Sequence, residues 1–419
     1  MFSTPRFATS RRLTPTDGQA RPEHILDPAI RKGIGRLMSN DRTLVKLALD
    51  FKTIPEAELG NLADALAQNS QLTALHLTGI QIANGGAVRL AAGLARNTCL
   101  RELNLFSNDI GTTGIEALAK AATDHPTLTS LDLGDNQIGP LGAHALAGML
   151  LNNKRLLTLE LRLNQLGSSG AQTLFGALAR NESLLTLALD KTDLDGRCTQ
   201  ALASSLACNR CLASLSLSGN ALGDEGVMII AEGLKANRHL RALNLVNVDL
   251  ADLGAGALAE VLEHHPTLET LGLSYGRIGD EGAVALARAL RRNTSLSALY
   301  LDNNPIRCAG AEALATSLAQ SNIHLLQLSL NADRMAASDE QCHIALALER
   351  NRGLLNCRQP ASSVEYRKAL QKYRQALRGD LAGDARAQVQ LELEKLMQQA
   401  DKLADPSQAI KLFPHLPPP

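Results

Sequence analysis

Leucines recur along this chain in a fixed pattern, L-x-x-L-x-L, that returns every 28 residues. The copies share one phase and begin at Leu44, Leu72, Leu100, Leu128, Leu156, Leu184, Leu212, Leu240, Leu268 and Leu296. An eleventh copy begins at Leu325, after one inserted residue. Chance does not keep one phase over so many copies, so the chain is an array of repeated structural units.

Each copy contains two hydrophobic periods, one after the other. The first part alternates apolar and polar residues, as in Leu131, Asp132 and Leu133, which predicts a half-buried β-strand. The second part spaces apolar residues three and four positions apart, which predicts a helix with one apolar stripe. In the copy that begins at Leu128, this stripe is Ala143, Leu146, Ala147 and Leu150.

Asparagine marks two positions of the repeat. At the ninth position, before a glycine-containing turn, we expect its side chain to bond the backbone of the neighbouring turn. These residues are Asn108, Asn136, Asn164, Asn220 and Asn304, and the row is interrupted at Thr192, Val248 and Gly276. Near the end of each helix, a second Asn is expected to form a left-handed C-cap. These residues are Asn69, Asn97, Asn153, Asn181, Asn209, Asn237 and Asn293.

The repeated units must stack, because one strand and one helix cannot bury their own apolar faces. Stacking produces a parallel sheet on one side and a layer of parallel helices on the other. Helices are about 10 Å wide, whereas neighbouring strands are about 4.8 Å apart, so the stack must curve with the sheet inside. The predicted fold class is therefore an α/β solenoid, a curved horseshoe with a concave sheet and convex helices.

This repeat resembles the ribonuclease-inhibitor-like class of leucine-rich repeats. The copy LTSLDLGDNQIGPLGAHALAGMLLNN, residues 128–153, carries the resemblance, which extends over about residues 44–352. The class includes ribonuclease inhibitors, the repeat regions of innate-immune receptors, the Ran GTPase-activating proteins and many bacterial effectors. The resemblance implies that partners bind on the concave face and the adjoining loops.

The repeats divide the chain into five segments. We predict a disordered tail at 1–22, a helical cap at 23–43, the solenoid of about eleven repeats at 44–358, a helical hairpin at 359–405, and a second disordered tail at 406–419. Ile30, Ile34, Leu37 and Met38 share one helical face in the cap. For the first tail, a transit peptide and a bacterial secretion signal remain alternatives to simple disorder.

Composition excludes several function classes. The 42 basic and 42 acidic residues give a net charge of zero, so the chain is not expected to bind nucleic acid or a membrane surface. No apolar run approaches the length of a membrane span. Seven scattered cysteines indicate a reducing compartment, so we expect a cytoplasmic protein, with export of a bacterial effector into a host cell as a variant of this hypothesis.

Two groups of metal-ligating residue types have simpler structural interpretations. Cys208 and Cys211 have the spacing of a metal or redox pair, but no second pair exists, and Cys211 occupies the repeat position that Cys99 also occupies. His265 falls where other repeats carry the helix-end Asn, so we expect it to cap a helix beside His264. We therefore predict no metal site, no cofactor and no enzymatic activity.

The third, fifth and seventh positions of each repeat are expected to face the concave side, because side chains alternate along a strand. Acidic residues at these positions favour a partner with a basic surface, and scarce exposed aromatic residues are typical anchors of interfaces. The predicted partner site comprises Glu102, Phe106, Asp132, Glu160, Arg162, Asp190, Tyr275, Tyr300 and Asp302. Tyr275 lies one position further out than the concave positions.

The sequence therefore favours a monomeric protein-interaction module, such as a bacterial effector or a receptor-like scaffold. Two alternatives from other classes remain. One is a GTPase activator, because the Ran-activating family shares this repeat class. The other is an adaptor or ligase that recruits ubiquitination machinery through the C-terminal helices, which rests on analogy.

Overall fold

In a computed structural model, the described residues are 27–330 together with Ile344, Leu348 and Asn351. The predicted tails at 1–22 and 406–419 and the predicted hairpin at 359–405 lie outside these residues. The segment boundaries proposed from the sequence stay predictions. Among the helices of the described part, none is long and apolar enough to cross a membrane.

The strands form one open parallel sheet in which each strand pairs with the strands of the repeats before and after it. The register is regular, since residues at the same repeat position lie opposite each other, as Leu131 and Leu159 do. The strands are β1 (Lys46–Ala48), β2 (Ala74–His76), β3 (Glu102–Asn104), β4 (Ser130–Asp132), β5 (Thr158–Glu160), β6 (Thr186–Ala188), β7 (Ser214–Ser216), β8 (Ala242–Asn244), β9 (Thr270–Gly272), β10 (Ala298–Tyr300) and β11 (Gln327–Ser329).

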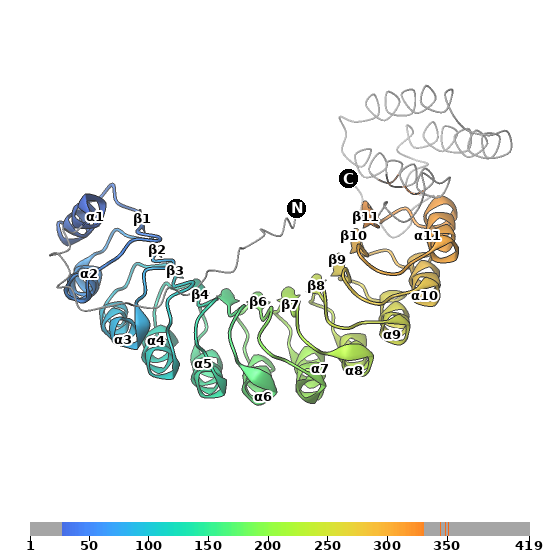
Figure 1. The fold of residues 1–419 in the computed structure, drawn as a ribbon, viewed down its shortest axis with the longest axis horizontal. Helices are drawn as coiled ribbons and strands as arrows, with labels where there is room; N and C mark the ends of the chain where they lie inside the picture. Colours follow the sequence, from blue (N-terminus) through green and yellow to red (C-terminus); the bar gives the residue numbers. More distant parts are fainter. Residues whose placement is uncertain (1–26, 331–343, 345–347, 349–350, 352–419) are drawn as a thin grey trace, which may run out of the picture.

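The helices lie on the outer side of the curve and the sheet on the inner side, as Figure 1 shows. This confirms the predicted solenoid and its horseshoe shape. The helices are α1 (Pro28–Met38), α2 (Glu56–Gln68), α3 (Ala83–Leu94), α4 (Thr112–Thr123), α5 (Pro140–Asn152), α6 (Gly167–Leu178), α7 (Thr199–Cys208), α8 (Gly223–Ala236), α9 (Asp252–Leu262), α10 (Asp280–Leu290) and α11 (Cys308–Gln320). A short 3-10 helix, η1 (Gly196–Cys198), precedes α7.

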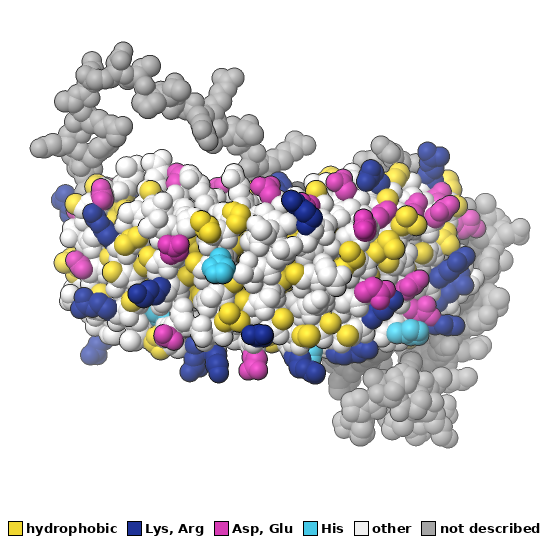
Figure 2. Space-filling model, turned by 90° about the horizontal axis from the view of Figure 1, so that it is seen from below, with side chains coloured by type: hydrophobic (Ala, Val, Ile, Leu, Met, Phe, Trp, Pro, Cys, Tyr) yellow, Lys and Arg dark blue, Asp and Glu magenta, His cyan; other side chains and the backbone are white. Residues whose placement is uncertain are grey.

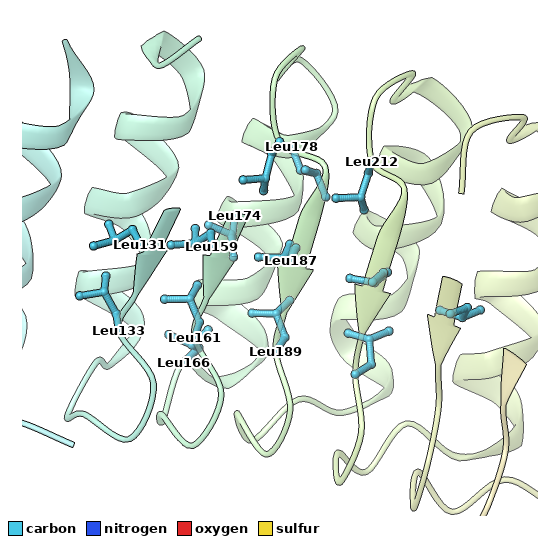
Figure 3. Packing of buried hydrophobic residues seen from close by; sticks show 14 of the residues in the cluster. Leu131, Leu133, Leu159, Leu161, Leu166, Leu174, Leu178, Leu187, Leu189 and Leu212 are labelled. Atoms are coloured by element: carbon cyan, nitrogen blue, oxygen red, sulfur yellow. The ribbon is translucent and has the colours of Figure 1, made fainter. Parts of the chain in front are cut away.

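The core is one continuous layer of leucine, isoleucine and alanine between the sheet and the helices. Figure 3 shows the fourth- and sixth-position leucines of successive repeats, such as Leu131 and Leu159, forming rows from strand to strand. The stripe predicted on α5 is buried as expected. Because each repeat buries its leucines against the next one, the apolar layer holds the whole array together.

Helix α1 covers the open end of the sheet before β1. Asp27 begins the helix, and its Oδ1 accepts a hydrogen bond of 2.8 Å from the Ala29 N–H. Ile30 and Ile34 are buried as predicted. Met38 was wrongly placed on the buried face, since 64% of it is exposed where the helix ends.

The helix-end Asn residues do not adopt the left-handed conformation that the sequence suggested. Asn209, for example, is extended, with φ −68° and ψ 135°. Its Nδ2 donates hydrogen bonds to the carbonyl oxygens of Leu178 (2.7 Å) and Asn181 (3.1 Å), and its Oδ1 accepts from the N–H groups of Cys211 (3.0 Å) and Leu212 (2.7 Å). These buried side chains therefore connect each repeat to the one before it.

The ninth-position Asn residues behave as predicted. The Nδ2 of Asn164 donates to the Leu133 carbonyl of the preceding repeat at 3.0 Å, and its Oδ1 accepts from the Ile138 N–H at 3.0 Å. At one interruption of this row, the Thr192 hydroxyl donates to the Leu189 carbonyl of its own repeat at 2.7 Å instead. The side-chain bond to the previous repeat is lost there, although the Gly167 N–H of that repeat still donates to the Thr192 carbonyl at 3.2 Å.

Several helices receive their N-terminal cap from the repeat before them. No side chain of the N-cap residue itself caps α10, but the Oδ1 of Asp252 in α9 accepts from the N–H groups of Gly279 (2.7 Å) and Gly282 (2.9 Å). Asp224 and Asp280 do the same for α9 and α11. A carboxylate also complements the positive end of a helix dipole, so these caps couple neighbouring repeats.

His125 and His265 occupy the position of the helix-end Asn, as expected for capping residues. The Nδ1 of His265 accepts from the Leu268 N–H at 3.1 Å, which places the ring proton on Nε2. That Nε2 is buried and has no hydrogen-bond partner among the described residues. Burial, together with the nearby Arg238 charge, lowers the pKa of His265 to about 4.

We expect the His265→Asn variant to be more stable than the wild type in mild acid. The unfolded chain binds a proton at His265 below about pH 6.5, whereas the folded chain does so only near pH 4. Protonation therefore favours unfolding between these values, and the free energy of unfolding falls by up to about 1.4 kcal/mol per pH unit for this residue. Asparagine removes this slope and supplies the Nδ2 donor of the other repeats.

Urea denaturation at pH 7.5, 6.0 and 5.0 measures this difference. His264→Asn is the matched control, because its side chain is 78% exposed beside His265. An equal pH slope in the wild type and in His265→Asn would contradict the assignment of His265 as a neutral cap.

Candidate functional site

The fifth positions of the first repeats form one row across the concave face. His76 lies opposite Asn104, Asn104 opposite Asp132, and Asp132 opposite Glu160, in the parallel registers of β2 to β5. Neighbouring members of such a row are about 4.8 Å apart in the strand-pairing direction. Of these four residues, Asp132 and Glu160 belong to the partner site predicted from the sequence, and the register places them side by side on one face.

Arg162 lies at the centre of this region. Its guanidinium contacts the carboxylates of Asp132 at 3.3 Å and Glu160 at 3.2 Å. It also lies over the ring of Phe106, 5.0 Å from the ring centroid, in a cation–π arrangement. Gly134 lies between them, because a Cβ at this glycine would be 2.8 Å from the Phe106 ring and 3.0 Å from Arg162 Cγ.

The carboxylates in this cluster are partly removed from water. Burial raises the pKa of Asp132, although the hydrogen bond from the Gly134 N–H and the positive charge of Arg162 oppose this effect. Burial also raises the pKa of Glu160, and the negative charges of Asp132 and Asp190 add to the increase. The single guanidinium therefore does not fully compensate the cost of burying these negative charges.

Two further acidic residues flank the cluster and have partners other than Arg162. Asp190 accepts from the Ser216 hydroxyl and from the Ser218 N–H at 3.0 Å. Glu102 lies 2.7 Å from Nε2 of His76. We name Glu102, Phe106, Asp132, Glu160, Arg162 and Asp190 the acidic cluster. The structure brings these predicted residues together on neighbouring repeats.

The remaining predicted residues lie further along the array. Tyr300 and Asp302 belong to the tenth repeat, seven strand steps after β3. Tyr300 is half-buried, so its expected exposure was wrong, whereas Tyr275 is 56% exposed. The Tyr275 N–H donates to the Asp302 carbonyl at 2.8 Å, and Tyr275 has φ +59°, in a loop at the carboxyl edge of the strands.

Sequence reasoning missed two contributors to the acidic cluster. His76 occupies the fifth position of its repeat, so the alternation that selected Asp132 could have identified it. Gly134 carries no chemistry of its own, and its role is to leave space for Phe106 beside Arg162. No metal-binding group of His, Cys, Asp or Glu occurs within the described ranges.

Comparisons with known proteins agree with this architecture. A family model described as the TMOD/LMOD leucine-rich domain matches residues 27–168. A leucine-rich-repeat model matches residues 208–231, 236–259, 264–287 and 292–315. No curated protein matches the chain.

Two solved structures are among those similar to this chain. One is leiomodin-1 actin-binding site 2, at 25% identity, with a TM-score of 0.30, over 37% of this chain and 83% of that chain. Another is the tropomodulin C-terminal domain of Caenorhabditis elegans, at 16% identity, with a TM-score of 0.33, over 45% of this chain and 96% of that chain. The 28-residue period, the parallel sheet and the two matching repeat models together show that the chain is a leucine-rich-repeat protein.

Proposed function

We propose that the chain is a protein-interaction module whose acidic cluster binds a basic surface of a partner protein. The observation that carries the proposal is the set of three half-buried carboxylates, Asp132, Glu160 and Asp190, on successive repeats against the single guanidinium of Arg162. A rigid sheet holds them, so a partner meets a preformed arrangement of charge.

The electrostatics of the cluster explain how such a partner would gain affinity. Burial raises the pKa of Asp132 and Glu160 because it destabilises their charged forms. A lysine or arginine of the partner, placed within about 4–6 Å, would stabilise those charged forms and lower both pKa values. Negative potential on the concave face would also steer a basic partner toward it and increase the association rate.

Tyr275, Tyr300 and Asp302 form the proposed second contact region. Seven strand intervals separate β3 from β10, or about 34 Å along the inner sheet at about 4.8 Å each. A folded domain spans this distance, whereas a short peptide reaches one region alone. We therefore favour a folded partner protein.

We propose that the chain acts as a bacterial effector or a receptor-like scaffold. In this proposal it is monomeric, cytoplasmic and not an enzyme. Activation of a small GTPase is the alternative from another class, and recruitment of ubiquitination machinery is a further one. GTP hydrolysis by a small GTPase, measured with and without catalytic amounts of this chain, separates activation from simple binding.

We expect the double variant Asp132→Asn and Glu160→Gln to bind its partner about tenfold more weakly than the wild type does. The substitutions keep the shapes of the side chains and remove the charges, so association should slow and its salt dependence should decrease. Affinity capture with mass spectrometry identifies the partner, and stopped-flow kinetics at several salt concentrations then measures the effect.

The matched control is the convex pair Glu232→Gln and Arg288→Gln, which alters exposed charges on α8 and α10. Binding that depends on the convex pair and tolerates the concave pair would place the partner on the helices instead.

A further inference from the structure

A second surface lies at the opposite ends of the strands, along the edge where helices end and strands begin. The residue at the second position of each repeat precedes the strand, and backbone hydrogen bonds join these residues into a row. The Leu157 N–H donates to the Thr129 carbonyl, that of Leu185 to Leu157, and that of Ala213 to Leu185, each at 2.8 Å. Neighbouring side chains of this row therefore lie about 4.8 Å apart.

The centre of this row is apolar and open to solvent. Leu157 is 39% exposed and Leu185 is 41% exposed, although both have large aliphatic side chains. Leu151, in the last turn of α5 on the same connection as Leu157, is 48% exposed. Leu157 and Leu185 are neighbours in the row, and Leu151 lies at the end of the helix that leads to Leu157, so three partly exposed leucines belong to this edge.

Positive charges surround this patch. The row itself carries Arg101 before and Arg241 after the apolar centre, and the helix-to-strand connections add further exposed cations. We name the following set the basic–apolar edge: Arg96, Arg101, Leu151, Lys154, Arg155, Leu157, Arg180, Leu185, Arg210, Arg238 and Arg241. Figure 2 shows dark blue side chains along the lower edge of the convex face, whereas magenta ones gather mainly toward its upper right.

Most of these cations have no carboxylate partner. Arg241 pairs with Glu269, but the other cations of the basic–apolar edge form no ion pair with a residue that the structure describes. The acidic residues on these connections between α3 and β8 are Asp124 and Glu182. Helix dipoles favour cations in the last turn of a helix. They do not account for Arg155 and Arg210, which lie beyond the ends of α5 and α7.

We infer that the basic–apolar edge is a second docking surface, which binds an acidic amphipathic segment of a partner protein. The leucines would contact apolar side chains of that segment, and the surrounding cations would pair with its carboxylates. This edge is positively charged and would bind an acidic segment, whereas the acidic cluster on the concave face would bind a basic surface. The two surfaces therefore select different partners, or different parts of one partner.

Two other ligands fit the surface less well. A nucleic acid would use the cations but leave the three leucines without contacts, and the edge offers no aromatic side chain for base stacking. An anionic membrane would require apolar side chains that protrude into the lipid, whereas these leucines are each more than half covered by the protein. An acidic amphipathic peptide uses both the charges and the partly exposed leucines.

A peptide-display selection on the full chain tests the inference. The probe is a random 16-residue library displayed on phage, selected on the wild-type chain and counter-selected on the variant Leu157→Ser and Leu185→Ser. We expect the surviving peptides to be enriched in Asp and Glu together with Leu, Ile or Phe. Survivors without acidic enrichment, or no survivors above background, would overturn the inference.

Fluorescence anisotropy with synthetic copies of the selected peptides then locates the site. Binding should weaken at least tenfold in the leucine variant and in the variant Arg155→Glu and Arg210→Glu. The control variant Leu141→Ser and Leu253→Ser changes exposed leucines at the opposite ends of helices, so binding should stay within twofold of the wild type. The concave variant Asp132→Asn and Glu160→Gln should also bind the selected peptides as the wild type does.

Two further probes decide between ligand classes. A 30-nucleotide single-stranded RNA and vesicles of phosphatidylserine and phosphatidylcholine are titrated against the same variants. The inference requires that peptide binding weakens both in the leucine variant and in the arginine variant. If the edge variants weaken only RNA binding or only vesicle binding, the surface recognises that ligand and the inference is wrong. Circular dichroism verifies that each variant is folded.

Discussion

Replacing Gly233 by alanine should destabilise the protein by about 2 kcal/mol, although alanine is the better helix former. Gly233 lies inside α8, where α8 packs against α7. A Cβ at this position would lie 2.6 Å from the Ala203 Cα and closer still to the Ala203 carbonyl oxygen. Backbone atoms of a helix cannot move aside as a flexible side chain can, so α8 must shift away from α7.

Gly148→Ala is the matched control for this prediction. Gly148 is also inside a helix, α5, but a Cβ there meets no atom within 4 Å. The same substitution should therefore stabilise the protein by about 0.5–1 kcal/mol, because alanine loses less conformational entropy on folding than glycine does. Urea denaturation followed by circular dichroism measures both variants. Equal shifts of the same sign would show that close packing between helices does not limit residue 233.

The leucine pattern was sufficient to predict the architecture. A 28-residue period with alternation and then helical spacing leaves one way to bury Leu131 and Leu146 together, and the parallel sheet confirms it. The period could not predict how the helix-end Asn residues act. Asparagine tolerates both left-handed and extended backbone, and carbonyl groups of the preceding repeat decide in favour of the extended form at Asn209.

Backbone conformation at the eighth position of the repeat could be predicted from the sequence only where that position is glycine. Gly79 and Gly219 suggest a left-handed turn there, and the structure shows positive φ at both. Leu163 and Tyr275 occupy the same position with φ of +59°, a conformation that bulky residues rarely adopt. The stacked hydrogen bonds of neighbouring repeats impose this conformation, so the local sequence does not reveal it.

The candidate site could be predicted in part. Alternation along the strands was enough to place Asp132, Glu160 and Arg162 on one face, because residue position alone decides the face. It could not predict that Phe106 contacts Arg162, since that contact reaches across two strand intervals and requires Gly134 between them. Phe106 is therefore partly covered by its own chain rather than freely available to a partner.

The largest effect is expected for Asn209→Ala, which should lower the free energy of unfolding by about 3 kcal/mol or more. The Asn209 amide group satisfies the N–H groups of Cys211 and Leu212 and donates to the carbonyl oxygens of Leu178 and Asn181, and both Asn209 and Leu212 are buried. Alanine leaves the N–H groups of Cys211 and Leu212 without this acceptor, whereas the Leu178 carbonyl keeps the Asn181 N–H (3.2 Å) and the Asn181 carbonyl keeps the Cys211 thiol (3.3 Å). Each unsatisfied group costs about 1–3 kcal/mol.

Two further substitutions separate hydrogen bonding from loss of volume. Asn209→Asp keeps the size of the side chain and its acceptor, but it points a second oxygen at the Leu178 and Asn181 carbonyls. We expect this variant to be at least as unstable as Asn209→Ala.

Asn61→Ala, on the exposed face of α2, removes only a 3.1 Å bond to Glu58 and should change stability by less than about 0.5 kcal/mol. Urea denaturation compares the variants, and amide hydrogen exchange at Leu212 should accelerate in both Asn209 variants. If Asn209→Ala proved no more disruptive than Asn61→Ala, the apolar layer alone would hold adjacent repeats together.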